Sequence, residues 1–242
     1  MFARPFPPAL LAGAAALSLL AQTAAATPVS LTYTGPSAAD PRSVTIDAAP
    51  VAWPGSGDWP RSVGAFGFTM SDGSGVLGDF VAWCLDLGRF LATTAQGAQD
   101  YTITATPFSN AFGLDAAERA RVQDVFDANY ATLDLGNGIQ VAGFQLALWD
   151  ALYDGDGSLA SGLFQASAST AITNAADGFM AAAAAWDDGR RFNMTFLESS
   201  GDPQRQALVT VAPIPLPAGG FLLLTGVGGL VVLRRRKTAR AT

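Results

Sequence analysis

The stretch Phe80-Val81-Ala82-Trp83-Cys84-Leu85-Asp86-Leu87 is apolar at every position before Asp86. A strand that is apolar on both faces is covered on both sides, so residues 80–87 are predicted to form a central strand. The segment also carries the only cysteine of the chain, Cys84. We therefore expect the fold to be built around this strand, with its neighbours supplied by other parts of the chain.

Segments before and after this strand alternate between apolar and polar residues, which is typical of half-buried strands. Clusters of Gly, Pro, Ser and Asp separate several of them and indicate turns. Further strands are predicted at residues 29–33, 44–46, 66–70, 101–105, 192–197 and 207–211.

The middle of the chain has helical patterns instead. Asp115, followed three residues later by Glu118, indicates a capped helix start. Residues 139–153 are apolar almost all round and predict a buried helix, and a third helix is expected over residues 170–186. The predicted fold is α+β: a β-sandwich-like core that carries a helical insertion at about 115–186.

Composition excludes several classes of function. The chain has 242 residues, which suits one mid-sized domain, and it contains no histidine. Arg4 and five C-terminal cations account for six of the 14 Lys+Arg, so residues 27–217 hold 8 Arg against 20 Asp+Glu, a net charge of −12. Such an acidic body argues against nucleic-acid binding. The absence of histidine rules out histidine-based triads, general bases and metal sites. We expect no metal, no cofactor and no enzymatic turnover.

The N-terminus has the pattern of a secretory signal peptide. A basic start at Arg4 precedes an apolar run over residues 9–21 and then Ala24-Ala25-Ala26. Cleavage is expected after Ala26, so residues 1–26 are predicted to be removed and the body at 27–210 to be extracytoplasmic.

The C-terminus has the pattern of a membrane anchor. Prolines at 211–217 form a linker, an apolar run at 218–233 is just long enough for a short transmembrane helix, and a basic tail occupies 234–242. Cationic residues stay on the cytoplasmic side. The basic residues that stop transfer are Arg234, Arg235 and Arg236.

This C-terminal pattern resembles a PEP-CTERM sorting signal of the VPLPA variety. The matching motif is Ile214-Pro215-Leu216-Pro217-Ala218, in which Ile214 replaces the usual Val. The resemblance implies a precursor held in the inner membrane and cut near the prolines by an exosortase-type membrane transpeptidase. It also implies a final place in the cell envelope, at the cell surface or in the extracellular matrix of exopolysaccharide- and biofilm-forming bacteria.

Two short motifs carry candidate chemistry. One is Trp83-Cys84-Leu85-Asp86, and the other is Phe144-Gln145-Leu146-Ala147-Leu148-Trp149. Gln145 is a polar residue on a buried helix, and a buried carboxamide is costly unless it is hydrogen-bonded or used. A thiol and a carboxamide that meet in a dry site can condense to an internal thioester with loss of ammonia. The prediction pairs Cys84 with Gln145 and surrounds them with Trp83, Asp86, Phe144 and Trp149.

The two motifs resemble the Cys–Gln thioester domains of bacterial surface adhesins, over about residues 80–154. The resemblance implies covalent attachment to an amine or hydroxyl of a surface component, such as a protein or an exopolysaccharide. The alternative is a non-covalent structural or carbohydrate-binding matrix protein with an inert, buried Cys84 and a Gln145 bonded to nearby backbone.

Three other features have ordinary explanations. Gln140 is a rival to Gln145 but lacks the apolar sequel that ends in Trp149. The run Asp154-Gly155-Asp156-Gly157-Ser158 resembles the start of a Ca²⁺ loop, but its twelfth position is Gln165 rather than Glu, which favours a turn. The five tryptophans are a candidate sugar-binding platform, although Trp149 and Trp186 are expected in the core.

Overall fold

The structure is a computed structural model that describes residues 27–104, 107 and 114–213. Helices α1 (Ala116–Asn129), α2 (Gly138–Tyr153) and α3 (Thr170–Ala184) pack against one another. A short 3₁₀ helix, η1, spans Thr94–Gln96. The strands are β1 (Thr27–Pro36), β2 (Arg42–Ala48), β3 (Arg61–Ala65), β4 (Phe68–Asp72), β5 (Asp79–Cys84), β6 (Gln99–Thr104), β7 (Gln165–Ser167), β8 (Phe192–Ser199) and β9 (Leu208–Pro213).

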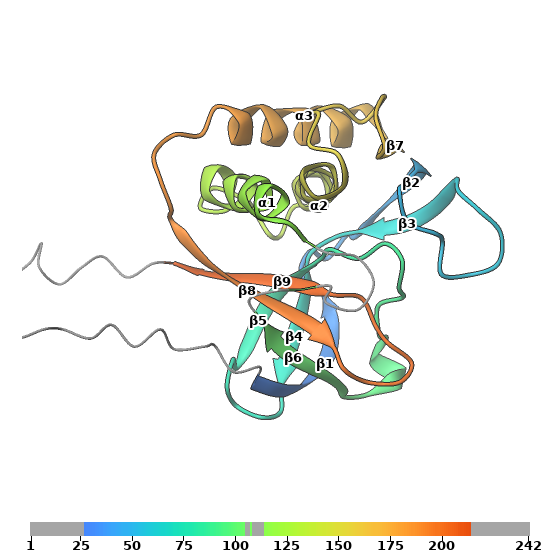
Figure 1. Ribbon diagram of the computed structural model, residues 1–242, viewed down its shortest axis with the longest axis vertical. Helices are drawn as coiled ribbons and strands as arrows, with labels where there is room; N and C mark the ends of the chain where they lie inside the picture. Colours follow the sequence, from blue (N-terminus) through green and yellow to red (C-terminus); the bar gives the residue numbers. More distant parts are fainter. Residues whose placement is uncertain (1–26, 105–106, 108–113, 214–242) are drawn as a thin grey trace, which may run out of the picture.

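Six strands close into a barrel in the order β1-β4-β5-β9-β8-β6, with β1 bonded to both β4 and β6 (Figure 1). The α+β class is confirmed, but the expected β-sandwich is corrected to a closed barrel. Strand β1 is 10 residues long: residues 27–31 pair with β6 and residues 31–36 pair with β4, with a register shift against β4 between Tyr33 and Gly35. Alternating apolar residues face inward in a barrel as they do in a sandwich, so the pattern alone does not separate the two.

A second, three-stranded sheet has the order β3-β2-β7. Neither β3 nor β7 was predicted. Strand β7 lies inside the helical insertion and pairs with β2 through Ile46 and Ala166. Both side chains are buried, so this pairing fastens the insertion to the rest of the body.

The helices stack beside the barrel, with α3 outermost on α1 and α2 (Figure 1). Asp115 caps α1 through the predicted capping box, in which its carboxylate accepts from Glu118 N at 2.7 Å. Helix α2 is buried along almost its whole length, as predicted. At Gly143 a Cβ atom would come within 2.9 Å of Ala176 N, so the absent side chain allows α3 to approach closely.

The third helix ends before its predicted limit. Helix α3 stops at Ala184, and Trp186 lies outside it, partly exposed. The Arg191 guanidinium sits over the Trp186 ring at 4.1 Å, so this tryptophan covers a cation instead of filling the core.

Both targeting predictions lie outside the described residues. These are the signal peptide at 1–26 and, at the other end, Ile214 to Ala218, the apolar run at 218–233 and the basic tail with Arg234, Arg235 and Arg236. Strand β9 continues to Pro213, past the body boundary expected at residue 210. Among residues 27–104, 107 and 114–213, no helix has the length and apolar character needed to span a membrane.

Candidate functional site

Cys84 is the last residue of β5, and β5 lies between β4 and β9 in the barrel. Its side chain is 7% exposed. Burial raises the pKa of the Cys84 thiol, and the Asp86 carboxylate raises it further. The thiol therefore stays protonated at neutral pH, and the predicted central position of this strand is confirmed.

Gln145 reaches Cys84 from helix α2, but it contacts the main chain. Its Nε2 donates to Cys84 O at 2.8 Å, and its Oε1 accepts from Cys84 N at 3.0 Å. The β4–β5 ladder ends at Ala82, so these two main-chain groups need another partner, and the fully buried Gln145 carboxamide supplies both bonds. The predicted pairing of this carboxamide with the sulfur is therefore replaced by a main-chain clamp.

The carboxamide beside the sulfur belongs to Gln206, two residues before β9 begins at Leu208. The Cys84 Sγ lies 2.7 Å from Gln206 Oε1. That separation is typical of O–H···O bonds, and sulfur is larger than oxygen, so the two groups are closer than a thiol hydrogen bond requires. It is the kind of spacing found when sulfur and oxygen are attached to one carbon.

The main chain of Gln206 is held from both directions. Its N–H donates to Phe90 O at 3.2 Å, and its carbonyl accepts from the Tyr101 hydroxyl at 3.2 Å. One residue later, Ala207 O accepts from Leu85 N at 3.0 Å. These contacts fix the approach of the carboxamide to the thiol before any reaction takes place.

Tyr153, eight residues after Gln145 on α2, forms a second clamp on the chain after Cys84. Its hydroxyl donates to Leu85 O at 2.9 Å and accepts from Leu87 N at 2.9 Å. Burial raises the pKa of Tyr153, so the hydroxyl keeps the proton that it donates. Strand β5 ends at Cys84, earlier than predicted, because helix α2 replaces a strand neighbour from this point.

One hollow, of about 330 Å³, lies next to this site. Another, of about 300 Å³, is lined by Cys84 and Gln206, and we call it the thiol hollow. Its walls are mainly apolar and include Trp53, Phe66 and Trp149. Gln206 is partly exposed whereas Cys84 is buried, so Gln206 is the more accessible of these two residues of the thiol hollow.

The four residues expected to surround the pair divide into two groups. Trp149 lines the thiol hollow, and Asp86 lines the neighbouring one. Trp83 and Phe144 instead pack on each other with ring centroids 4.6 Å apart, in the core between β5 and α2. They keep water away from the far side of the strand.

Gln206 was missed by the sequence reasoning. It stands in the run Arg205-Gln206-Ala207-Leu208-Val209, directly before a strand that was predicted. An amide at the entrance to a buried strand was the available signal. Local sequence does not show that this strand pairs with the strand of Cys84, through Cys84↔Leu208.

The acidic loop after α2 is a turn, as predicted. Asp154 Oδ2 accepts from the main-chain N–H groups of Leu163 and Phe164, and Asp156 Oδ1 accepts from Ser158 N at 2.8 Å. The carboxylates therefore bond within their own loop. Within the described part of the chain, no group of three or more Cys, Asp or Glu is placed to hold a metal ion.

Chemically, the site brings the Cys84 thiol to the Gln206 carboxamide in a mainly apolar hollow where both main chains are held by hydrogen bonds. Attack of the sulfur on Gln206 Cδ would form a C–S bond, break the C–N bond and release ammonia, which would carry away the thiol proton.

No protein-family model matches the chain, and a search of the curated proteins finds no match. Among solved structures, the chain is similar to the N-terminal domain of the Streptococcus pyogenes pilus tip adhesin Cpa. The two are 12% identical, and the match covers 76% of this chain and 99% of that chain with a TM-score of 0.41.

Proposed function

We propose that this protein carries an internal thioester between Cys84 Sγ and Gln206 Cδ and uses it once, to attach itself covalently to a partner. The observation that carries the proposal is the 2.7 Å separation of Cys84 Sγ and Gln206 Oε1. Further support comes from the clamps that hold both residues and from the apolar walls of the thiol hollow.

The attachment step is a transfer of the acyl group. An amine or hydroxyl of the partner adds to Gln206 Cδ, the C–S bond breaks, and the proton of the nucleophile passes to the sulfur. Because burial raises the pKa of Cys84, the sulfur leaves as a thiol. The chain ends in an amide or ester with its partner and does not turn over, so the protein is not proposed to be an enzyme.

The setting of this reaction is proposed from the two ends of the chain. A signal peptide at 1–26 and a sorting signal at Ile214 to Ala218 would deliver the body to the envelope, surface or matrix through the inner membrane. An exosortase-type transpeptidase is the proposed processing partner. Deleting residues 216–242 is expected to release the protein into the medium, and unchanged retention in the envelope would contradict the sorting proposal.

The thioester is tested by intact-mass spectrometry of the purified protein. The wild type is expected to be lighter than its sequence by one ammonia, and Cys84→Ala is expected to have its full mass. Methylamine should add to the wild type and not to the variant. Gln140→Ala is a matched control, because Gln140 bonds to Asp134 N at 3.1 Å outside the thiol hollow and should leave the mass deficit intact.

A wild type of full mass that takes up no amine would refute the thioester. Cys84 would then be a buried, inert thiol, and the non-covalent alternative would stand.

A further inference from the structure

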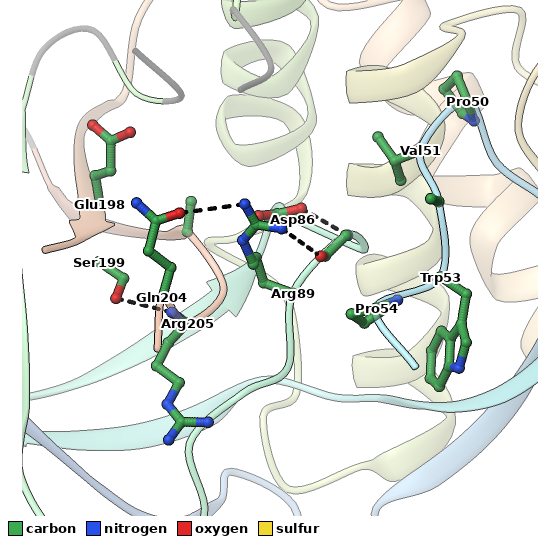
Figure 2. Close-up of a pocket in the computed structure, with 13 residues that line it drawn as sticks. Pro50, Val51, Trp53, Pro54, Asp86, Arg89, Glu198, Ser199, Gln204 and Arg205 are labelled. Carbon is green, nitrogen blue, oxygen red and sulfur yellow. Dashed lines mark hydrogen bonds between the residues drawn. The ribbon is translucent and has the colours of Figure 1, made fainter. Parts of the chain in front are cut away.

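The neighbouring hollow lies against the thiol hollow. Its volume is about 330 Å³, and we call it the side hollow (Figure 2). The two hollows share Trp53 and Arg89 in their linings. The segment around Gln206 runs between them, since Arg205 and Ala207 line the side hollow whereas Gln206 lines the thiol hollow. A molecule bound in the side hollow would therefore lie next to the reacting carbonyl.

One wall of the side hollow is apolar and stiff. It is formed by residues 50–54, in which Pro50 and Pro54 restrict the backbone (Figure 2). Trp53 is wedged edge-to-face against Trp59 and Phe90, with ring centroids 5.3 and 5.4 Å away. The wall is thus present before any ligand arrives.

The opposite wall is polar and carries charges of both signs. Asp86 and Glu198 supply carboxylates and Arg89 supplies a guanidinium group, whereas the Arg205 guanidinium turns away (Figure 2) and its Nε donates to Gln99 Oε1 at 3.2 Å. Arg89 Nη2 donates to Gln204 Oε1 at 3.3 Å, as Figure 2 shows. In a body with a net charge of −12, a wall that carries both signs of charge matches neither a polyanion nor a polycation.

We propose that the side hollow binds a neutral sugar unit of the partner whose amine or hydroxyl attacks the thioester. A sugar ring has an apolar C–H face that fits the Pro50–Pro54 wall, and hydroxyl groups that both donate to carboxylates and accept from guanidinium groups. The volume lies at the lower end of the about 300–1,000 Å³ range of small-molecule sites, which suits one or two rings. The covalent step rests on the function proposed above, whereas sugar binding does not.

Sugar binding is tested without the thioester, in the full chain carrying Cys84→Ser. The probes are methyl glycosides and trisaccharides of glucose, galactose, mannose and N-acetylglucosamine, observed by saturation-transfer NMR. At least one is expected to bind saturably and to bind about tenfold more weakly to a chain that also carries Trp53→Ala. Gln204→Ala, at an exposed position, is a second variant with an expected loss if Trp53→Ala does not fold. Val76→Ala, on the turn between β4 and β5, should change nothing.

The covalent step is tested on the wild type. Aminopropyl glycosides of the sugar that binds are expected to consume the thioester at least about tenfold faster than propylamine, with saturation. If no saccharide binds, or if a lysine peptide displaces the sugar, the saccharide assignment is overturned while the mass deficit of the wild type still stands. If the mass deficit is missing but sugar binds, the thioester fails and the sugar site survives.

Discussion

Cys84 has two glutamine neighbours, and the surroundings of the two differ sharply. On the main-chain side, Gln145 is fully buried, and its carboxamide oxygen and nitrogen are both hydrogen-bonded to Cys84 N and O. On the sulfur side, Gln206 is partly exposed and places its Oε1 2.7 Å from the thiol. The same functional group is thus used for structure in one place and is available for reaction in the other.

Burial and hydrogen bonding decide whether each carboxamide has a structural or a chemical role. A carboxamide that already makes two hydrogen bonds to buried main-chain groups is held away from reaction. Removing it leaves those groups unpaired and lowers the stability of the fold. A carboxamide that faces a sulfur in a hollow, with its main chain held by Phe90 and Tyr101, is positioned for attack.

The largest effect is expected from Gln206→Ala. It should abolish both the loss of ammonia and methylamine uptake, because the acyl carbon is gone, while the melting temperature changes little. Intact-mass spectrometry and circular dichroism measure the two effects. A variant that still lost ammonia would return the acyl role to Gln145.

Gln145→Ala should act on stability instead. It leaves Cys84 N and O buried without partners, which is expected to cost about 3 kcal/mol of unfolding free energy. Urea denaturation measures the loss, with Gln140→Ala as the matched control on the same helix. A cost as small as that of the control would contradict the clamp.

Asp150 is a polar residue on α2 whose bonding is incomplete. It is 3% exposed, and its Oδ1 has no partner. Burial raises its pKa to about 7, with help from the Asp156 and Asp154 carboxylates, against the opposing effects of Gly157 N and Arg121. The folded protein therefore holds a proton that the unfolded chain loses near pH 4, so this residue makes stability fall as pH rises toward 7.

Asp150→Asn should remove that dependence. Between pH 5 and 8 the variant is expected to gain about 2 kcal/mol relative to the wild type. Thermal unfolding across this range measures the difference. Parallel stability curves would show that Asp150 titrates normally in the folded protein.

The smallest effect is expected from Tyr101→Phe. It removes one hydroxyl bond to Gln206 O and should cost about 1 kcal/mol. If the bond positions Gln206, the reaction with methylamine should slow by several fold while the mass deficit persists. An unchanged rate would assign Tyr101 to the barrel core alone.

Much of the fold could be read from local patterns. The strand of Cys84, the Asp115–Glu118 capping box and the buried α2 all follow from periodicity and capping chemistry. Barrel closure could not be read, because it depends on β1 pairing with both β4 and β6, which are distant in sequence. Strand β3 was missed because Arg61–Ala65 has little apolar alternation.

The site divides in the same way. Cys84 and its apolar environment were predictable, because the sequence has one cysteine and that cysteine stands in an apolar strand pattern. Gln145 was correctly singled out as a buried amide in need of partners, but local sequence does not say whether those partners are sulfur or main chain. Gln206 becomes visible only when β9 is placed beside β5.

The pairing of β9 with both β5 and β8 also bears on how the protein would carry load. A partner bonded to Gln206 and a pull applied beyond Pro213 are separated by a single strand of covalent backbone. Tension would run along β9 and bypass the barrel and the helices. The hydrogen bonds on both edges of β9 would carry little of this load, so the barrel would stay folded while the covalent backbone of β9 bears the pull.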